Sequence, residues 1–232
     1  MEDQITQMTS TTFLGKLAVF MEEGGVFMWV ILAFWCFGVA IALERFFSLR
    51  RYGIKGKPLM DEIKKYVINN DVAQAIAFCS NAKSILPNVL KSGLMRANQS
   101  KEQISDAVEV KILETMPKVE KRLPSLILMA NVSTLLGLLG TIYGLTQSFA
   151  AVAASDPASK AKLLALGISK AMNTTALGLI SAISLMLIHS LLSGKAEKIL
   201  SDMNEYSIKL IDLLGTRKGV SSRGGVSSRE AA

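Results

Sequence analysis

The residues that could do chemistry lie in two long apolar stretches, where small and hydroxyl-bearing side chains recur at helical spacing. In the first stretch the intervals are three and four residues: Thr134, Gly137, Thr141, Gly144 and Ser148. That spacing places all five on one face of a helix. A hydroxyl can both donate and accept a hydrogen bond, so in apolar surroundings such a face could serve water, an ion or a partner's carboxylate.

The second stretch repeats the pattern with Gly167, Ala171, Thr174, Gly178 and Ser181, and Thr175 follows directly after Thr174. Close helix packing is the alternative explanation, because small residues let two backbones approach and Gly140-x-x-x-Gly144 has the spacing of a helix-dimer motif. Packing accounts less well for hydroxyls on both faces. We therefore assign Gly137, Gly140, Gly144 and Gly178 to helix packing, and Thr134, Thr141, Ser148, Thr174 and Thr175 to an ion pathway or partner contact.

Three apolar stretches are long enough to cross a membrane: residues 26–43, 124–154 and 163–192. About 20 residues of helix suffice to span the hydrocarbon core. Half of the 232 residues are of hydrophobic type, and the mean hydropathy is +0.36, which favours a membrane protein over a soluble domain.

The distribution of Lys and Arg predicts the orientation. The segment 44–123 holds 15 of the 26, whereas 1–25 holds one and the link 155–162 holds two. The positive-inside rule then puts 1–25 and the link in the periplasm, and 44–123 and the C-terminal part in the cytoplasm. The net charge of +7 is thus explained by topology, and we expect no nucleic-acid partner.

The cytoplasmic parts read as helix. Ser100, with Gln103 three residues later, is a predicted helix N-cap, and residues 193–214 continue the third span with apolar residues on one face. The end, 215–232, repeats GVSSR and lacks apolar content, which predicts disorder. The expected fold is an all-α membrane protein with three transmembrane helices, N-terminus outside and C-terminus inside, a helical cytoplasmic domain and long helices that extend into the cytoplasm.

Lys170 is the only charge in the third stretch. It could extend its amine to the outer interface, or it could pair with an acid of a partner protein. The chain shows no nucleophile–base pair, phosphate loop or metal-ligand set, so we expect neither an enzyme nor a metal or organic cofactor.

The two motifs GLLGTIYGLTQSF (137–149) and GISKAMNTTALGLISAI (167–183) resemble the ExbB, TolQ and MotA proton-channel family, in particular its ExbB/TolQ branch. GGVFMW before the first span and LERFFSLRR after it are similar to that branch too. Many ExbB and TolQ proteins carry a glutamate where this chain has Lys170, so any proton-relay role at that position does not carry over.

The resemblance implies a homopentamer in the bacterial inner membrane around two copies of a single-span ExbD/TolR-like partner, whose membrane aspartate takes up and releases protons. Thr141 and Thr175 match the family's channel threonines. A TonB-like or TolA-like protein would receive the work, which implies TonB-dependent outer-membrane transport. Tol-type envelope maintenance, gliding motility and a non-conducting pentameric scaffold stay open as alternatives, and so does Na⁺ in place of H⁺.

Overall fold

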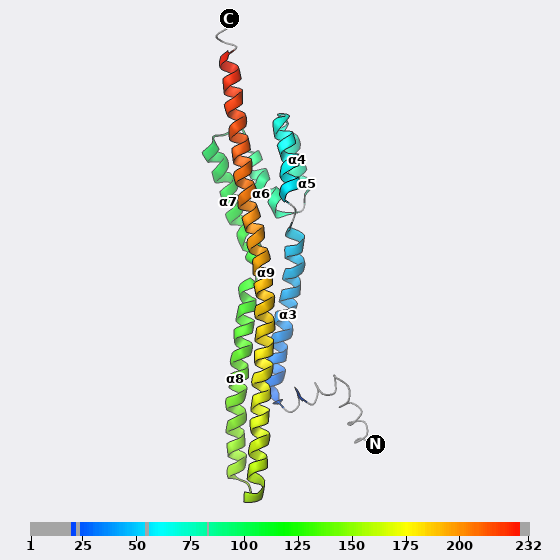
Figure 1. Ribbon diagram of the computed structural model, residues 1–232, viewed down its shortest axis with the longest axis vertical. Helices are drawn as coiled ribbons and strands as arrows, with labels where there is room; N and C mark the ends of the chain where they lie inside the picture. The colour runs from blue at the N-terminus through cyan, green and yellow to red at the C-terminus, as the bar shows by residue number, and fades with distance from the viewer. Residues whose placement is uncertain (1–19, 22–23, 54–55, 83, 228–232) are drawn as a thin grey trace, which may run out of the picture. The chain divides into compact units, whose positions relative to one another are not determined.

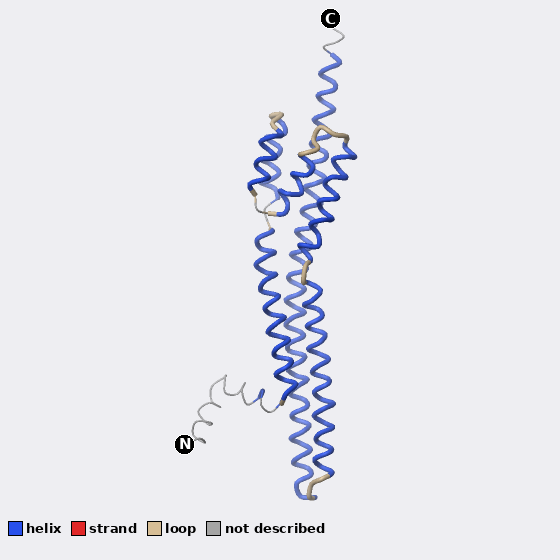
Figure 2. Tube along the Cα trace, turned by 180° about the vertical axis from the view of Figure 1, so that it is seen from behind, coloured by secondary structure: helices blue, strands red, loops and turns tan. Residues whose placement is uncertain are grey.

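A computed structural model describes residues 20–21, 24–53, 56–82 and 84–227 of the chain. Figure 2 shows helices joined by short loops, with no strand in these ranges. Figure 1 labels the helices in chain order: α3 (Val26–Tyr52), α4 (Gly56–Ile68), α5 (Val72–Asn81), α6 (Ile85–Leu94), α7 (Lys101–Glu120), α8 (Leu123–Ala153) and α9 (Pro157–Ser227).

Three helices, α3, α8 and α9, are long and apolar enough to cross a membrane. This confirms the all-α fold with three membrane-spanning helices. The predicted link 155–162 is largely helical, because α9 already begins at Pro157. Proline is favoured at the first position of a helix, where its missing N–H has no partner to lose. The predicted periplasmic segment 1–25 lies mostly outside the described residues.

The prediction of a disordered tail from residue 215 also differs from the structure. Helix α9 is 71 residues long and continues to Ser227; residues 228–232 lie outside the described ranges. No proline follows Pro157 in the helix, and extending an existing helix is much less costly than nucleating one. The separately predicted segment 193–214 is thus part of α9, as its apolar periodicity indicates.

The chain divides into two compact units. The first comprises residues up to Glu44 together with Arg122–Leu191, and in it the three long helices run side by side (Figure 1). Small and hydroxyl-bearing residues are buried between these helices, including Ser133, Ser148, Thr174 and Ser181, while large apolar side chains such as Leu135 point outward. This inverts the arrangement of a soluble protein and is typical of helices that pack within lipid.

Helix α3 is attached to α9 by one polar and several apolar contacts. The Trp35 indole Nε1 donates to the Ser184 hydroxyl at 2.7 Å. Trp35 also packs on a buried cluster that contains Ala182 and Leu185. A methyl group at Gly38 would lie 2.8 Å from a Leu185 carbon, so the absence of a side chain there allows α3 to approach.

The second unit comprises residues 45–121 and 192 onward. Its core side chains come from several helices and include Ile63, Leu90, Ile104, Met203 and Leu210, all fully buried. The predicted cap at Ser100 is confirmed: its hydroxyl accepts from the Gln103 N–H and the Gln103 side chain accepts from the Ser100 N–H. Helix α7 ends at Glu120, and Arg122 takes a positive φ of 61° before α8 begins.

Cys79 of α5 is fully buried in the second unit, and this burial raises the pKa of its thiol to about 11. At pH 8 the thiolate, which is the reactive form, is therefore scarce. We expect a Cys36→Ser variant to resist maleimide under native conditions and to label rapidly in denaturant. Because the pKa of the Cys79 thiol is higher in the folded than in the unfolded chain, the free energy of unfolding of the second unit should also fall as the pH rises above 9. Rapid native labelling of Cys79 would contradict its burial.

Candidate functional site

The two small-residue stripes face each other across α8 and α9. We call this contact the seam; it consists of Ser133, Gly137, Gly140, Gly144 and Ser148 on α8, and Gly167, Ala171, Thr174 and Gly178 on α9. A methyl group at Gly178 would lie 2.8 Å from the Ser133 carbonyl oxygen and 2.9 Å from the Gly137 Cα. Both neighbours are backbone atoms, so the close approach of the two helices depends on glycine.

At two other seam glycines the nearest neighbours are side-chain atoms of α9. A methyl group at Gly140 would lie 2.9 Å from the Thr174 Cβ, and one at Gly144 would lie 3.1 Å from the Ala171 Cβ. The structure therefore places all four glycines of the packing assignment in the seam. Residues three or four apart lie on the same helix face. This is why Gly137, Gly140 and Gly144, which recur at that spacing, all contact α9.

Three of the predicted threonines lie along the edge of the seam and are half-buried. Thr175 donates its hydroxyl to the Gly137 carbonyl oxygen of α8 at 3.1 Å, so it joins the two helices. Thr141 donates to Leu138 of its own helix at 2.6 Å, and Thr134 donates to Ala130 at 3.2 Å. Each hydroxyl still has acceptor capacity, because donating one hydrogen bond leaves its oxygen lone pairs available.

Two of the predicted pathway residues are placed differently. Thr174 and Ser148 are buried inside the seam, 1% and 5% exposed. Their hydroxyls donate to carbonyls of their own helices, at 2.8 Å to Ala171 and at 2.8 Å to Gly144. Both therefore contribute to the packing between α8 and α9, and their assignment to an ion pathway stays a prediction. Spacing alone did not predict this burial, because a stripe of small residues is wider than the strip that a neighbouring helix covers.

A polar pair that the sequence analysis did not assign lies on the outward face of α8. The Gln147 side-chain amide donates to the Tyr143 hydroxyl at 2.8 Å, and both side chains are exposed. The Tyr143 ring lies 5.2 Å from that of Phe27 on α3. The signal was available: Gln147 is a strongly polar residue in an uncharged stretch, four residues from Tyr143, and residues four apart are neighbours on a helix.

Lys170 is half-buried and lies beside the start of α3. A methyl group at Gly25 would lie 3.0 Å from the Lys170 Cε and 3.1 Å from its Nζ. Gly25 has a φ of +74°, a conformation that residues with a side chain rarely adopt. The amine thus packs over the turn that leads into α3, a position consistent with an outer-interface lysine.

If the chain has the gradient-driven activity that the family resemblance implies, we expect Lys170→Gln to retain most of it, and Gly25→Ala to be more damaging. The alanine combines the left-handed backbone, which costs about 1–2 kcal/mol, with contact against the lysine. Growth of a strain that carries only the variant, under a condition that requires the complex, is the measurement. If Lys170→Gln abolished growth, and reversing an acid on a partner rescued Lys170→Glu, pairing with that partner would be the correct interpretation.

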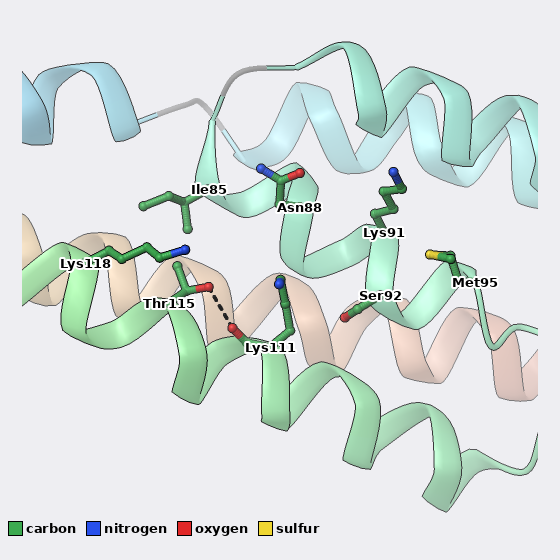
Figure 3. A pocket seen from close by; sticks show the side chains of 8 residues that line it. All are labelled: Ile85, Asn88, Lys91, Ser92, Met95, Lys111, Thr115 and Lys118. Atoms are coloured by element: carbon green, nitrogen blue, oxygen red, sulfur yellow. Dashed lines mark hydrogen bonds between the residues drawn. The ribbon is translucent and has the colours of Figure 1, made fainter.

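The second unit has a hollow of about 380 Å³ between α6 and α7, which is shown in Figure 3. Three lysines line it: Lys91, Lys111 and Lys118. Lys111 is paired with Glu114 at 2.8 Å, and the Thr115 hydroxyl is already bonded to the Lys111 carbonyl at 2.7 Å. None of the predicted site residues lies here, so this hollow is separate from the seam. Among the described residues, no group of three or more His, Cys, Asp or Glu could hold a metal.

Residues 81–205, which cover α6, α7, α8 and much of α9, match the MotA/TolQ/ExbB proton channel family. The chain belongs to this family. The match includes the whole seam and the three threonines along its edge. The resemblance read from the two threonine-bearing motifs is thereby confirmed.

Several relatives in the family are similar over different lengths. A biopolymer transport protein ExbB homolog of Methanothermobacter thermautotrophicus is 26% identical over 187 residues, 80% of this chain and 66% of that protein. The biopolymer transport protein exbB1 of Vibrio cholerae is 34% identical over 108 residues, 47% of each chain. The Tol-Pal system protein TolQ of Haemophilus influenzae is 28% identical over 52% of this chain and 48% of its own length. The chain thus aligns with about half to two thirds of each of these family members.

Among solved structures, the family's MotAB complex from C. jejuni contains a similar chain. The TM-score is 0.61, and the alignment covers 93% of this chain and 90% of that one. The sequence identity is 14%, so this likeness concerns the fold alone.

Proposed function

We propose that the chain is the channel-forming subunit of a proton-driven motor in the bacterial inner membrane. It would be inserted with its N-terminus in the periplasm and its C-terminus in the cytoplasm, as the Lys and Arg distribution predicts. Membership of a proton-channel family and three helices able to cross a membrane support this assignment. The observation that carries it is the hydroxyl-lined edge of the seam, because packing alone does not require those hydroxyls.

The subunit would work as a homo-oligomer, and the family resemblance gives five copies. Exposed polar groups on α8 favour such an assembly: Gln147 and Tyr143 bond each other, and Thr146 lies beside them. Polar side chains facing lipid are costly, so they commonly face the interior of an assembly or a water-filled cavity. A stable monomer in native mass spectrometry would contradict this proposal.

The partner would be a single-span protein with an aspartate in its membrane helix. The Thr175 hydroxyl, while bonded to the Gly137 carbonyl, can accept a hydrogen bond from a protonated carboxylic acid. An ionised carboxylate only accepts, so the hydroxyl would have to turn away from Gly137 to donate to it. Release of the proton by the partner would thus be linked to breaking the hydrogen bond between the Thr175 hydroxyl and the Gly137 carbonyl.

Hydrogen bonds to the charged form lower a carboxyl pKa, whereas desolvation in an apolar pore raises it. Donation by Thr175 and Thr141 would therefore bring the aspartate's pKa back toward the range in which it can both bind and release protons. The energised process is proposed to be TonB-dependent outer-membrane transport. Similarity to TolQ of two organisms makes Tol-type envelope maintenance the second candidate.

The test is to co-express the chain with a short single-span protein, carrying a membrane aspartate, from a neighbouring gene. Co-purification and partner-dependent proton flux into liposomes are expected. The control is the same partner with Asp→Asn, which should assemble without flux. A complex that forms but conducts no ion with either partner would leave a membrane scaffold as the function. Repeating the flux measurement with a Na⁺ gradient in place of the proton gradient distinguishes the two ions.

A further inference from the structure

A larger hollow of about 1010 Å³ lies within the second unit, apart from the seam. Its walls come from the end of α3, the start of α4 and the part of α9 after residue 194. One acid, Asp202, lines it together with four cations: Arg50, Lys57, Lys195 and Lys198. We call it the basic hollow. Its net charge favours an anion.

The basic hollow has an aromatic and aliphatic wall as well as a cationic one. The Lys195 Nζ lies 4.4 Å from the centre of the Phe46 ring, and the Arg50 Cζ lies 5.9 Å from the same ring. A cation over an aromatic face is held in place at modest cost to its hydration. Pro58 and Ile199 add aliphatic surface. A ligand with both an anionic group and an apolar part would match these walls.

Charge pairing distinguishes these four cations from others in the same unit. Ion pairs of neighbouring helix positions satisfy Lys65, Lys111 and Lys209. Among the described residues, none of the four basic-hollow cations forms an ion pair with a carboxylate within 4 Å. The positive-inside rule accounts for cations in this part of the chain, but not for their convergence from segments about 145 residues apart on one unneutralised hollow.

The basic hollow begins directly after two of the apolar stretches. Phe46 follows Leu43 by three residues on α3, and Lys195 follows Leu192 by three residues on α9. Three residues of helix rise by about 4.5 Å, while the headgroup layer on each side of a bilayer is roughly 5–8 Å thick. With the proposed orientation, these residues lie at the depth of the headgroups of the cytoplasmic leaflet.

We propose that the basic hollow binds the phosphate headgroup of an anionic phospholipid of the cytoplasmic leaflet. The Arg50 guanidinium can hold two phosphate oxygens at once, and the lysines add point charges. The acyl chains would leave along Phe46 toward the hydrocarbon. A zwitterionic lipid places its own cation among four others and is disfavoured. This proposal rests on the membrane orientation given above, but on no partner protein and no ion flow.

The test uses the purified full-length chain in a neutral detergent, titrated with phosphatidylglycerol or phosphatidylcholine and measured by native mass spectrometry. Wild type is expected to retain phosphatidylglycerol in preference, and the preference should weaken with added salt. A Lys or Arg near an anionic surface contributes about a fivefold change in affinity. Arg50→Gln with Lys195→Gln should therefore weaken phosphatidylglycerol binding about 25-fold and leave phosphatidylcholine unchanged.

The matched control is Lys65→Gln with Lys111→Gln, which removes the same net charge from ion-paired sites of the same unit that do not line the basic hollow. Equal loss in the control, or equal binding of the two lipids by wild type, would overturn the proposal. Displacement of the lipid by millimolar inorganic phosphate would assign the hollow to a soluble phosphate instead. If the double variant fails to fold, the lipid preference and salt dependence of wild type still decide. Since no partner or gradient is used, failure here is separable from failure of the proposed motor function.

Discussion

Gly178→Leu is expected to separate α8 from α9 and to lower the free energy of unfolding of the first unit by about 3 kcal/mol. Even the first carbon of the new side chain would meet two backbone neighbours, the Ser133 carbonyl at 2.8 Å and the Gly137 Cα at 2.9 Å. Backbone atoms cannot change rotamer, so the helices themselves must move. The measurement is the thermal transition of the purified protein in detergent, followed by circular dichroism, together with its oligomeric state.

Gly194→Leu is the matched control, since Gly194 lies on the same helix and a methyl group there would find nothing within 4 Å. Leucine is a better helix former than glycine by up to about 1 kcal/mol, so this variant should be neutral or slightly more stable. If both variants melted alike, the seam would not be the contact that glycine protects, and the close approach at Gly178 would have no energetic role.

Thr175→Val is expected to assemble normally and to lower gradient-driven work by about 10- to 150-fold. Valine keeps the shape of threonine and removes the hydroxyl that donates to the Gly137 carbonyl. In the proposed mechanism this hydroxyl turns away from that carbonyl to donate to the partner's ionised carboxylate. Losing a hydrogen bond to a charged group costs about 1.5–3 kcal/mol, which corresponds to that range of rate. Thr141→Val is expected to behave similarly, because its hydroxyl lies on the same edge.

Two controls separate the hydroxyl from other effects of the substitution. Thr175→Ser keeps the hydroxyl and should retain much of the activity. Thr216→Val removes an exposed hydroxyl that bonds Asp212 of its own helix at 2.9 Å, and should leave activity near wild type. Complex formation by pull-down is measured in the same strain as the functional readout. Wild-type activity of both Thr175→Val and Thr141→Val would reduce the seam edge to a packing surface.

The spans and caps were predictable because their signals are local. A run of about 18 or more apolar residues with few or no charges has few alternatives to a membrane helix, and the Ser100–Gln103 capping box depends on residues three apart. The seam was only partly predictable. Gly137, Thr141 and Gly144 share a spacing of three and four, yet the glycines face α9 while Thr141 lies at the edge.

Spacing fixes which residues share a helix face, but the strip that a neighbour covers depends on where that neighbour lies. The same reason applies to Lys170, whose contact with Gly25 joins positions 145 residues apart. The basic hollow was unpredictable for this reason too: its cations are ordinary topology signals in the sequence, and their convergence is a property of the packing. The helix beyond residue 215 was missed because composition describes a free segment, not one attached to an existing helix.

In the first unit small residues are buried and large apolar side chains point outward, and this packing has a consequence for how the protein responds to temperature. The heat-capacity change of unfolding comes mainly from apolar surface newly exposed to water. The buried residues of the second unit, such as Leu90 and Met203, would be hydrated on unfolding, whereas the seam of small residues would open toward lipid. The second unit should thus have a curved stability profile with a maximum at about 10–20 °C, while separation of α8 from α9 should vary almost linearly with temperature. Cooling below that maximum would weaken the second unit more than the seam.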